Sequence, residues 1–222
     1  MNSKIAAIIA LIVVIGGGAY WYVTQQPPES VSVAQAANGE VSADADTSMV
    51  QEMSLGNPDA KVTVVEYASF TCPHCRNFHS NVFDQLKANY IDTGKIHFIY
   101  REVYFDRYGL WAGMIARCGG EMRYFGITDM IYDMQQEWTN SSDPTQIAAN
   151  LRQLGIASGL SGEQVDACMA DVAKAEAMVA VYNQNRQRDD VTSTPTFRIN
   201  GEKYGNMSYS DFADILEEKL AE

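Results

Sequence analysis

The feature that most constrains the fold is a pair of cysteines standing between a strand-like segment and a helix-like one. Residues 61–70 read KVTVVEYASF, a β-branched and aromatic run that predicts a buried strand. Cys72 and Cys75 follow directly, and apolar side chains recur every three or four residues from position 73 to position 90, which predicts a helix. Residues 95–103, KIHFIYREV, predict a second strand. The pattern predicts a βαβ unit with the cysteine pair at the N-terminus of its helix.

The N-terminal residues predict export from the cytoplasm. Residues 5–23 contain no charge, and as a helix they would rise roughly 28 Å, about the thickness of a bilayer core. Lys4 precedes this run, and no Lys or Arg follows before residue 61, so the positive-inside rule places the rest of the chain outside the cytoplasm. We predict that residues 1–23 are an uncleaved transmembrane anchor. The alternative is a cleaved signal sequence, for which AQA at residues 34–36 resembles a cleavage site.

Beyond the apolar run, composition and periodicity divide the chain. Residues 24–55 are rich in Ala, Ser, Gln, Pro and acidic residues without periodicity, and they predict a disordered linker. Residues 108–188 have apolar side chains three or four apart and predict a series of helices. Two of these helices have recognisable starts, Asp143 before a proline and Ser161 in a capping box with Gln164.

The C-terminal part returns to strands and then to a helix. Residues 194–206 read TPTFRINGEKYGN, in which Asn200-Gly201 is a strong signal for a two-residue β-hairpin. Residues 208–220 have apolar side chains on one helical face and predict an amphipathic helix.

Composition bounds the size of the core and disfavours one class of partner. A chain of 222 residues that is 46% hydrophobic has enough apolar material for a substantial core. The formal net charge of −12 disfavours nucleic acid as a partner, because phosphate binding needs a basic face.

Taken together, these motifs resemble the DsbA family of exported thiol-disulfide oxidoreductases. The resemblance rests on CPHC at the start of a helix, a helical block after the second strand, TPTF more than 100 residues later, and the closing hairpin and helix. It implies an α/β thioredoxin-like fold over residues 56–107 and 189–222, with an inserted α-helical domain at 108–188 and, here, one preceding transmembrane helix. The anchor and the threonine before the loop proline are more similar to the membrane-tethered branch of that family than to its free periplasmic enterobacterial member, which has valine there. The resemblance implies no bound cofactor.

The position of the CPHC motif at a helix start predicts different roles for its two sulfurs. Free backbone N–H groups and the positive end of the helix dipole stabilise a thiolate at Cys72, which we assign as the attacked and attacking sulfur. Cys75, one turn into the helix, then resolves the mixed disulfide. Pro73 and His74 lie between them, and His74 can add an N–H donor or a positive charge.

The resemblance implies further site residues. Glu66 would lie beneath the active site, where it takes and returns the proton of the Cys75 thiol, and its apolar neighbours predict that it is buried. Pro195 would be the cis proline that faces the cysteines. The backbone of Thr194 would pair with an extended substrate segment, as in strand addition.

The other two cysteines fall in the helical region. Cys118 and Cys168 are 50 residues apart in a chain predicted to be exported, and we predict that they form a structural disulfide. Two buried free thiols are the alternative.

Three alternatives remain open for the Cys72–Cys75 pair. A structural staple is disfavoured, because so short a loop gains little stability from bridging. A copper or zinc module would use His79 as a third ligand, but no fourth ligand lies nearby in sequence, so we predict no metal and expect His79 to be a partly exposed helix residue. A disulfide reductase or isomerase would use the same residues, and the sequence does not fix the direction of exchange.

The resemblance also implies partners and a location. Substrates would be reduced or misfolded exported proteins, and a DsbB-like quinone-linked membrane oxidase would reoxidise the site, or a DsbD-like electron donor would reduce it in a reductase. The expected location is the periplasmic side of the bacterial inner membrane, held by the N-terminal helix, or the soluble periplasm after signal cleavage.

Overall fold

The computed structural model describes residues 45–222, which lie in one compact unit. The anchor or signal sequence predicted for residues 1–23, and the linker up to residue 44, lie outside the described residues. Between residues 45 and 222, no helix is both long and apolar enough to cross a membrane.

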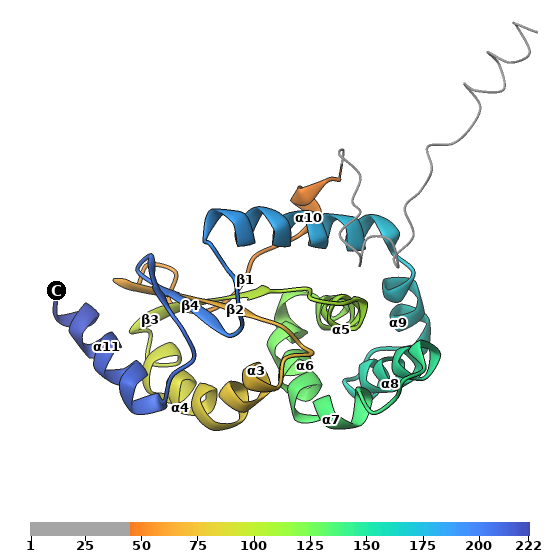
Figure 1. Cartoon of the computed structure of the whole chain (residues 1–222), viewed down its shortest axis with the longest axis horizontal. Helices are drawn as coiled ribbons and strands as arrows, with labels where there is room; N and C mark the ends of the chain where they lie inside the picture. Colours follow the sequence, from red (N-terminus) through yellow and green to blue (C-terminus); the bar gives the residue numbers. More distant parts are fainter. Residues whose placement is uncertain (1–44) are drawn as a thin grey trace, which may run out of the picture. The chain divides into compact units, whose positions relative to one another are not determined.

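A five-stranded mixed sheet forms the centre of the fold, in the order β1-β3-β2-β4-β5 (Figure 1). β2 (Val62–Ala68) and β3 (Ile96–Glu102) run parallel, as the βαβ pattern predicts. β1 (Met53–Gly56) pairs antiparallel with β3, while β4 (Thr196–Ile199) pairs antiparallel with β2 and with β5 (Glu202–Tyr204). β2 is apolar nearly throughout because both of its faces are covered.

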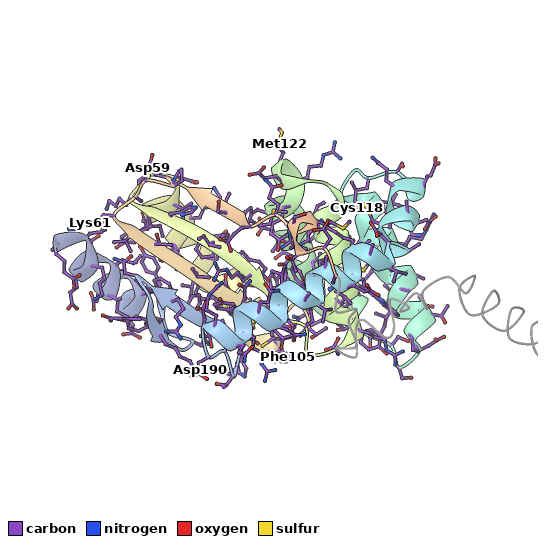
Figure 2. All side chains as sticks on the ribbon, turned by 90° about the horizontal axis from the view of Figure 1, so that it is seen from above. Asp59, Lys61, Phe105, Cys118, Met122 and Asp190 are labelled. Atoms are coloured by element: carbon purple, nitrogen blue, oxygen red, sulfur yellow. A yellow bond between two sulfur atoms is a disulfide. The ribbon has the colours of Figure 1, made fainter. Side chains whose placement is uncertain are left out.

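Helices cover both faces of the sheet. One face packs against α3 (Pro73–Phe78), η2 (His79–Phe83), α4 (Asp84–Leu86), η3 (Lys87–Ile91) and α11 (Tyr209–Ala221). The first four of these form one continuous helical run in which η2 and η3 are π-helical. The other face packs against α10 (Val172–Arg188), which lies over the strands when viewed from above (Figure 2).

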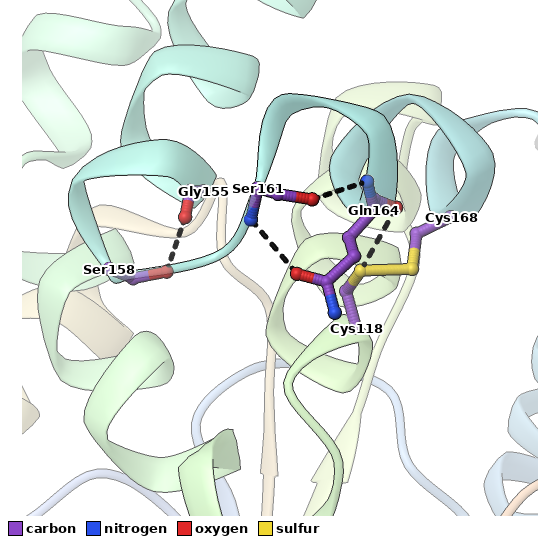
Figure 3. Close-up of a disulfide and its surroundings, with 6 residues drawn as sticks. All are labelled: Cys118, Gly155, Ser158, Ser161, Gln164 and Cys168. Atoms are coloured by element: carbon purple, nitrogen blue, oxygen red, sulfur yellow. Dashed lines mark hydrogen bonds between the residues drawn. A yellow bond between two sulfur atoms is a disulfide. The ribbon is translucent and has the colours of Figure 1, made fainter.

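Six helices connect β3 to β4. They are α5 (Arg107–Cys118), α6 (Glu121–Asp133), α7 (Gln135–Trp138), α8 (Pro144–Ala157), α9 (Gly162–Met169) and α10. Both predicted helix starts are confirmed. The Asp143 side chain accepts a hydrogen bond from the Thr145 N–H at 2.9 Å, and Ser161 forms a capping box with Gln164 (Figure 3).

The predicted hairpin is also confirmed. Asn200 and Gly201 have φ values of 46° and 86° and join β4 to β5. Both values lie in the left-handed region, which a two-residue type I′ turn requires and which Asn and Gly adopt most readily. The Asn200 side chain also accepts a hydrogen bond from the backbone N–H of Thr63 at 2.8 Å, which fastens the turn to β2.

The ordered fold begins earlier than the sequence pattern indicated. The predicted linker extends to residue 55, but η1 (Thr47–Met49) and β1 occupy residues within its last part. A four-residue edge strand is too short to show alternation, and its stability comes from pairing with β3 more than 40 residues away, so local sequence does not reveal it.

A buried ion pair joins the sheet to the helical region. Glu102, at the end of β3, accepts two hydrogen bonds from the Arg117 guanidinium on α5, at 2.7 and 2.6 Å. The two side chains are only 4% and 6% exposed. Tyr124 on α6 donates a third hydrogen bond to Glu102, and Arg117 also donates to the backbone oxygen of Gln51. One carboxylate thereby links β3, α5 and α6.

The Cys118–Cys168 disulfide is present and joins the end of α5 to α9 (Figure 3). We expect the double variant Cys118→Ser/Cys168→Ser to lose roughly 4 kcal/mol of unfolding free energy, because the bridge closes a loop of 50 residues. Urea denaturation of the variant and of the wild-type protein measures this loss. An unchanged midpoint would contradict a stabilising role for the bridge.

Candidate active site

The Cys72–Cys75 pair lies where β2 ends and the helical run begins. Cys72 is the N-cap residue of α3 and has extended backbone angles, and Pro73 occupies the first helical position, where its missing N–H costs nothing. The Cys72 N–H donates to the backbone oxygen of Ser69, which closes the turn after β2. The local sequence therefore places Cys72 at the helix N-terminus and Cys75 one turn inside.

Two side chains from the helical region hold this turn in place. Gln135 on α7 donates through Nε2 to the backbone oxygens of Phe70 and Cys72, at 2.8 and 3.1 Å. Thr71 donates to the Asp106 carboxylate, which also caps the start of α5. Sequence inspection did not identify Gln135 or Asp106 as site residues, because their contacts cross 35 to 65 positions of the chain.

Cys72 is half-buried, and its surroundings favour the thiolate. A hydrogen bond from the Cys75 thiol is the main factor that lowers the pKa of Cys72, to about 5, against a smaller opposing effect of burial. The Thr194 side chain and the backbone N–H groups of Cys75 and His74 contribute to the same shift. The donors from His74 and Cys75 sit at the start of α3, which is where a thiolate is expected to be stabilised.

Cys75 has the opposite environment. Its side chain is fully buried, and burial raises its pKa far above the ordinary value, with further contributions from the neighbouring Cys72 and from Glu66. One sulfur of the pair is therefore poised as a thiolate and the other as a neutral thiol.

The loop that contains Thr194 and Pro195 faces the cysteines. The Thr194–Pro195 peptide bond is cis, as the resemblance implied. The Cys72 thiol donates to the Thr194 backbone oxygen at 3.5 Å across a sequence separation of 122 residues. The Thr194 hydroxyl is buried and has no hydrogen-bond partner among the described residues, so it is free to donate to a thiolate.

Glu66 is fully buried in the middle of β2, as its neighbours predicted. The prediction that His79 is partly exposed is wrong. The residue is buried, with only 6% exposed, and its Nε2 lies 3.2 Å from Oε2 of Glu66. The helical spacing that puts Cys75 and His79 on one face turns that face toward the sheet, which buries both.

The remaining motif residues are exposed. Pro73 and the His74 side chain lie at the surface, and His74 acts on Cys72 through its backbone N–H. Within residues 45–222, no group of three or more His, Cys, Asp or Glu side chains is arranged to hold a metal ion. His79 contacts Glu66 instead of completing a ligand set with the two cysteines.

We expect Thr194→Val to raise the pKa of Cys72 above about 5, because the variant loses a side chain that stabilises the thiolate. In the wild-type protein the rate of attack by Cys72 on a small disulfide should fall as the pH drops below this value, and in the variant it should fall at a higher pH. The ultraviolet absorbance of the thiolate, followed against pH, measures both values. Coincident titration curves would contradict the assigned contribution of Thr194.

Comparison with known proteins agrees with this architecture. Residues 48–218 match the sequence model of the thioredoxin family. A Rickettsia bellii protein named "putative protein-disulfide oxidoreductase" is 34% identical over 77% of this chain and 65% of its own. The disulfide bond formation protein D of Bacillus subtilis is 24% identical over 75% and 76% of the two chains. This chain spans 61 to 65% of the length of the rickettsial relatives that it matches.

Solved structures show the same fold. The crystal structure of Wolbachia pipientis alpha-DsbA1 superimposes with a TM-score of 0.70 and 27% identity, and the match covers 84% of this chain and 96% of that one. The sequence match extends over residues 48–218, and the structural match covers most of both chains. The chain therefore belongs to the thioredoxin family, and within it to the DsbA-like proteins.

Proposed function

We propose that the protein is an exported thiol-disulfide oxidoreductase that introduces disulfides into substrate proteins. The observation that supports this most strongly is the contrast between the two sulfurs, since the pKa of Cys72 is lowered to about 5 while that of Cys75 is raised. A stable thiolate at Cys72 favours the reduced pair over the disulfide, and the Cys72–Cys75 disulfide is then a strong oxidant.

The proposed reaction has two exchange steps. A substrate thiolate attacks Cys72 Sγ, the Cys72–Cys75 bond breaks, and Cys75 leaves and takes a proton from Glu66. A second substrate thiolate then attacks the substrate sulfur of the mixed disulfide, and Cys72 leaves as a thiolate. Two electrons pass from the substrate dithiol to the cysteine pair. Of the two substrate protons, one replaces the proton that Glu66 gave to Cys75 and the other stays in solvent.

The loop at Thr194 supplies a docking place for the substrate backbone in this proposal. Its backbone oxygen already accepts a hydrogen bond from Cys72, so an extended segment paired there would present its sulfur to Cys72. Main-chain pairing gives affinity that depends little on the substrate's side chains, which suits an enzyme that acts on many reduced or misfolded proteins.

The location, partners and domain division remain parts of the proposal. The apolar residues 5–23 support a site of action on the periplasmic side of the inner membrane, with a DsbB-like quinone-linked oxidase as the reoxidising partner. We also propose that residues 108–188 act as an inserted helical domain between the two thioredoxin-like parts.

A synthetic peptide with two cysteines tests the activity. Mixed with the oxidised protein, the reduced peptide should gain an internal disulfide while the Cys72–Cys75 pair becomes reduced, as mass measurement after thiol trapping would show. The double variant Cys72→Ser/Cys75→Ser keeps the Cys118–Cys168 bridge and serves as the control. A peptide that stays reduced beside an unreacted Cys72–Cys75 disulfide would refute the proposal.

A further inference from the structure

His79 and Glu66 form a buried polar pair that the packing of the core does not require. His79 Nε2 and Glu66 Oε2 are 3.2 Å apart, an ion-pair distance. Neither carboxylate oxygen and neither imidazole nitrogen makes a hydrogen bond to another described residue. Burying four such atoms costs free energy that apolar side chains would avoid, and buried groups of this kind are often retained for chemistry.

Aromatic rings fix the orientation of the His79 imidazole. The ring of Tyr132 on α6 stacks on it, with centroids 4.3 Å apart and planes 22° apart. Phe83, one turn further along η2, packs at 4.8 Å. The imidazole is therefore held with Nε2 beside Glu66, and its second nitrogen lies on another edge of the ring.

The pair lies near two other titratable side chains, those of Cys75 and Asp129. Glu66 is close enough to Cys75 that its charge raises the pKa of that thiol, after burial and the charge of Cys72. Asp129 on α6 is exposed to solvent, although partial burial raises its pKa, and the neighbouring His79 lowers that pKa. α6 packs against η2, so Asp129 and His79 lie on neighbouring elements.

The other titratable groups around the pair have no comparable route to solvent. Tyr100 on β3 and Tyr132 are fully buried, hydrogen-bonded to each other at 2.6 Å, and held neutral because burial raises the pKa of both well above the usual value. Asp84 and Lys87 on the neighbouring helical run and Asp133 on α6 act electrostatically on Asp129: the two carboxylates raise its pKa and the lysine lowers it.

We propose that His79 and Asp129 form the path along which Glu66 exchanges its proton with solvent while Cys75 reacts. His79 is thus a positioning and relay residue, and this inference rests on the proposed function of the cysteine pair. An imidazole suits the role because one nitrogen can donate a proton while the other accepts one.

The proton balance can be written for the resolving step. Cys72 in a mixed disulfide is attacked by Cys75 Sγ, the bond from Cys72 to the outer sulfur breaks, and that sulfur leaves as a thiolate. The Cys75 proton passes to Glu66 and from Oε2 to His79 Nε2, and the imidazole then releases it toward the exposed Asp129 and water. Oxidation of a substrate moves the proton in the opposite direction, from water to Cys75.

Single-turnover oxidation of the reduced full chain by oxidised glutathione tests the path. Cys72 first attacks glutathione disulfide and forms an adduct, and Cys75 then resolves the adduct. Acid quenching and mass measurement separate the two phases. The variant H79Q keeps the size and hydrogen-bonding capacity of the side chain but cannot relay a proton. The control is H97Q, which alters a histidine on β3 outside the path.

We expect the resolving phase of H79Q to be about 100-fold slower than in the wild-type protein, with an unchanged first phase, because a relayed proton supports the transfer. The deficit should shrink as the pH rises, since bulk base then removes the proton. An unchanged resolving phase overturns the proposal. Equal slowing of both phases at every pH also overturns it, since that pattern indicates only a structural role.

The variant D129N provides a second test that does not depend on the folding of H79Q, because Asp129 is exposed. Its resolving phase should also slow while its first phase is unchanged, and wild-type kinetics would overturn the path. Failure of the proposed function looks different, because the wild-type pair would then have a low reduction potential or would form no glutathione adduct at Cys72, whatever the kinetics of H79Q and D129N.

Discussion

Replacing Cys72 with serine is expected to reduce disulfide transfer to a dithiol peptide by at least about a thousandfold, since loss of a catalytic nucleophile typically costs several orders of magnitude. The half-buried Cys72 is the sulfur whose pKa is lowered, to about 5, and a serine hydroxyl can neither form the disulfide nor ionise at that pH. The peptide assay measures the loss.

Cys75→Ser is the matched control. Cys75 is buried with a raised pKa, so its serine variant should keep the attack by Cys72 on an added disulfide, oxidised glutathione, release one glutathione thiolate and stop at the mixed disulfide. Trapped adduct in Cys75→Ser and none in Cys72→Ser would assign the two roles. Equal adduct formation by both variants would contradict the assignment.

The largest expected loss of stability follows from breaking the buried ion pair. Arg117→Met should lower the free energy of unfolding by about 3–5 kcal/mol, because it leaves the Glu102 carboxylate buried without its partner. The same change removes the link between β3 and α5. Urea denaturation of the variant and the wild-type protein measures the difference.

Two further variants show whether burial of the Glu102–Arg117 pair is the reason for the large loss of stability. Arg152→Met breaks an exposed pair with Asp166 that has similar two-point geometry, and it should cost less than about 1 kcal/mol. Glu102→Leu/Arg117→Met should be more stable than Arg117→Met alone, since no buried charge is left unpaired. Equal losses for Arg117→Met and Arg152→Met would contradict this account.

Local sequence predicted the parts of the fold that depend on local physics. The βαβ unit, the caps at Asp143 and Ser161, and the Asn200-Gly201 turn each have their cause within a few neighbouring residues. The Cys118–Cys168 bridge was expected from an even number of cysteines in a chain predicted to be exported, and it is present.

The parts that sequence could not predict depend on contacts between distant segments. β1 is a strand because β3 offers it a partner, and Gln135 belongs to the site because α7 packs beside the turn after β2. His79 lies in a helical segment like many others, and only the packing of that segment against β2 and α6 places it beside Glu66. The one sequence signal for this placement is that His79 shares a helical face with Cys75, and that face is buried.

The reduction potential of the Cys72–Cys75 pair tests the central claim most directly. The full chain would be equilibrated in glutathione buffers of known ratio, and the oxidised fraction would be measured by thiol trapping and mass. The stabilised Cys72 thiolate predicts a strongly oxidising pair, with a reduction potential of about −120 mV, where DsbA lies. A reduction potential of about −270 mV, where thioredoxin lies, would contradict a role in disulfide formation and indicate a reductase.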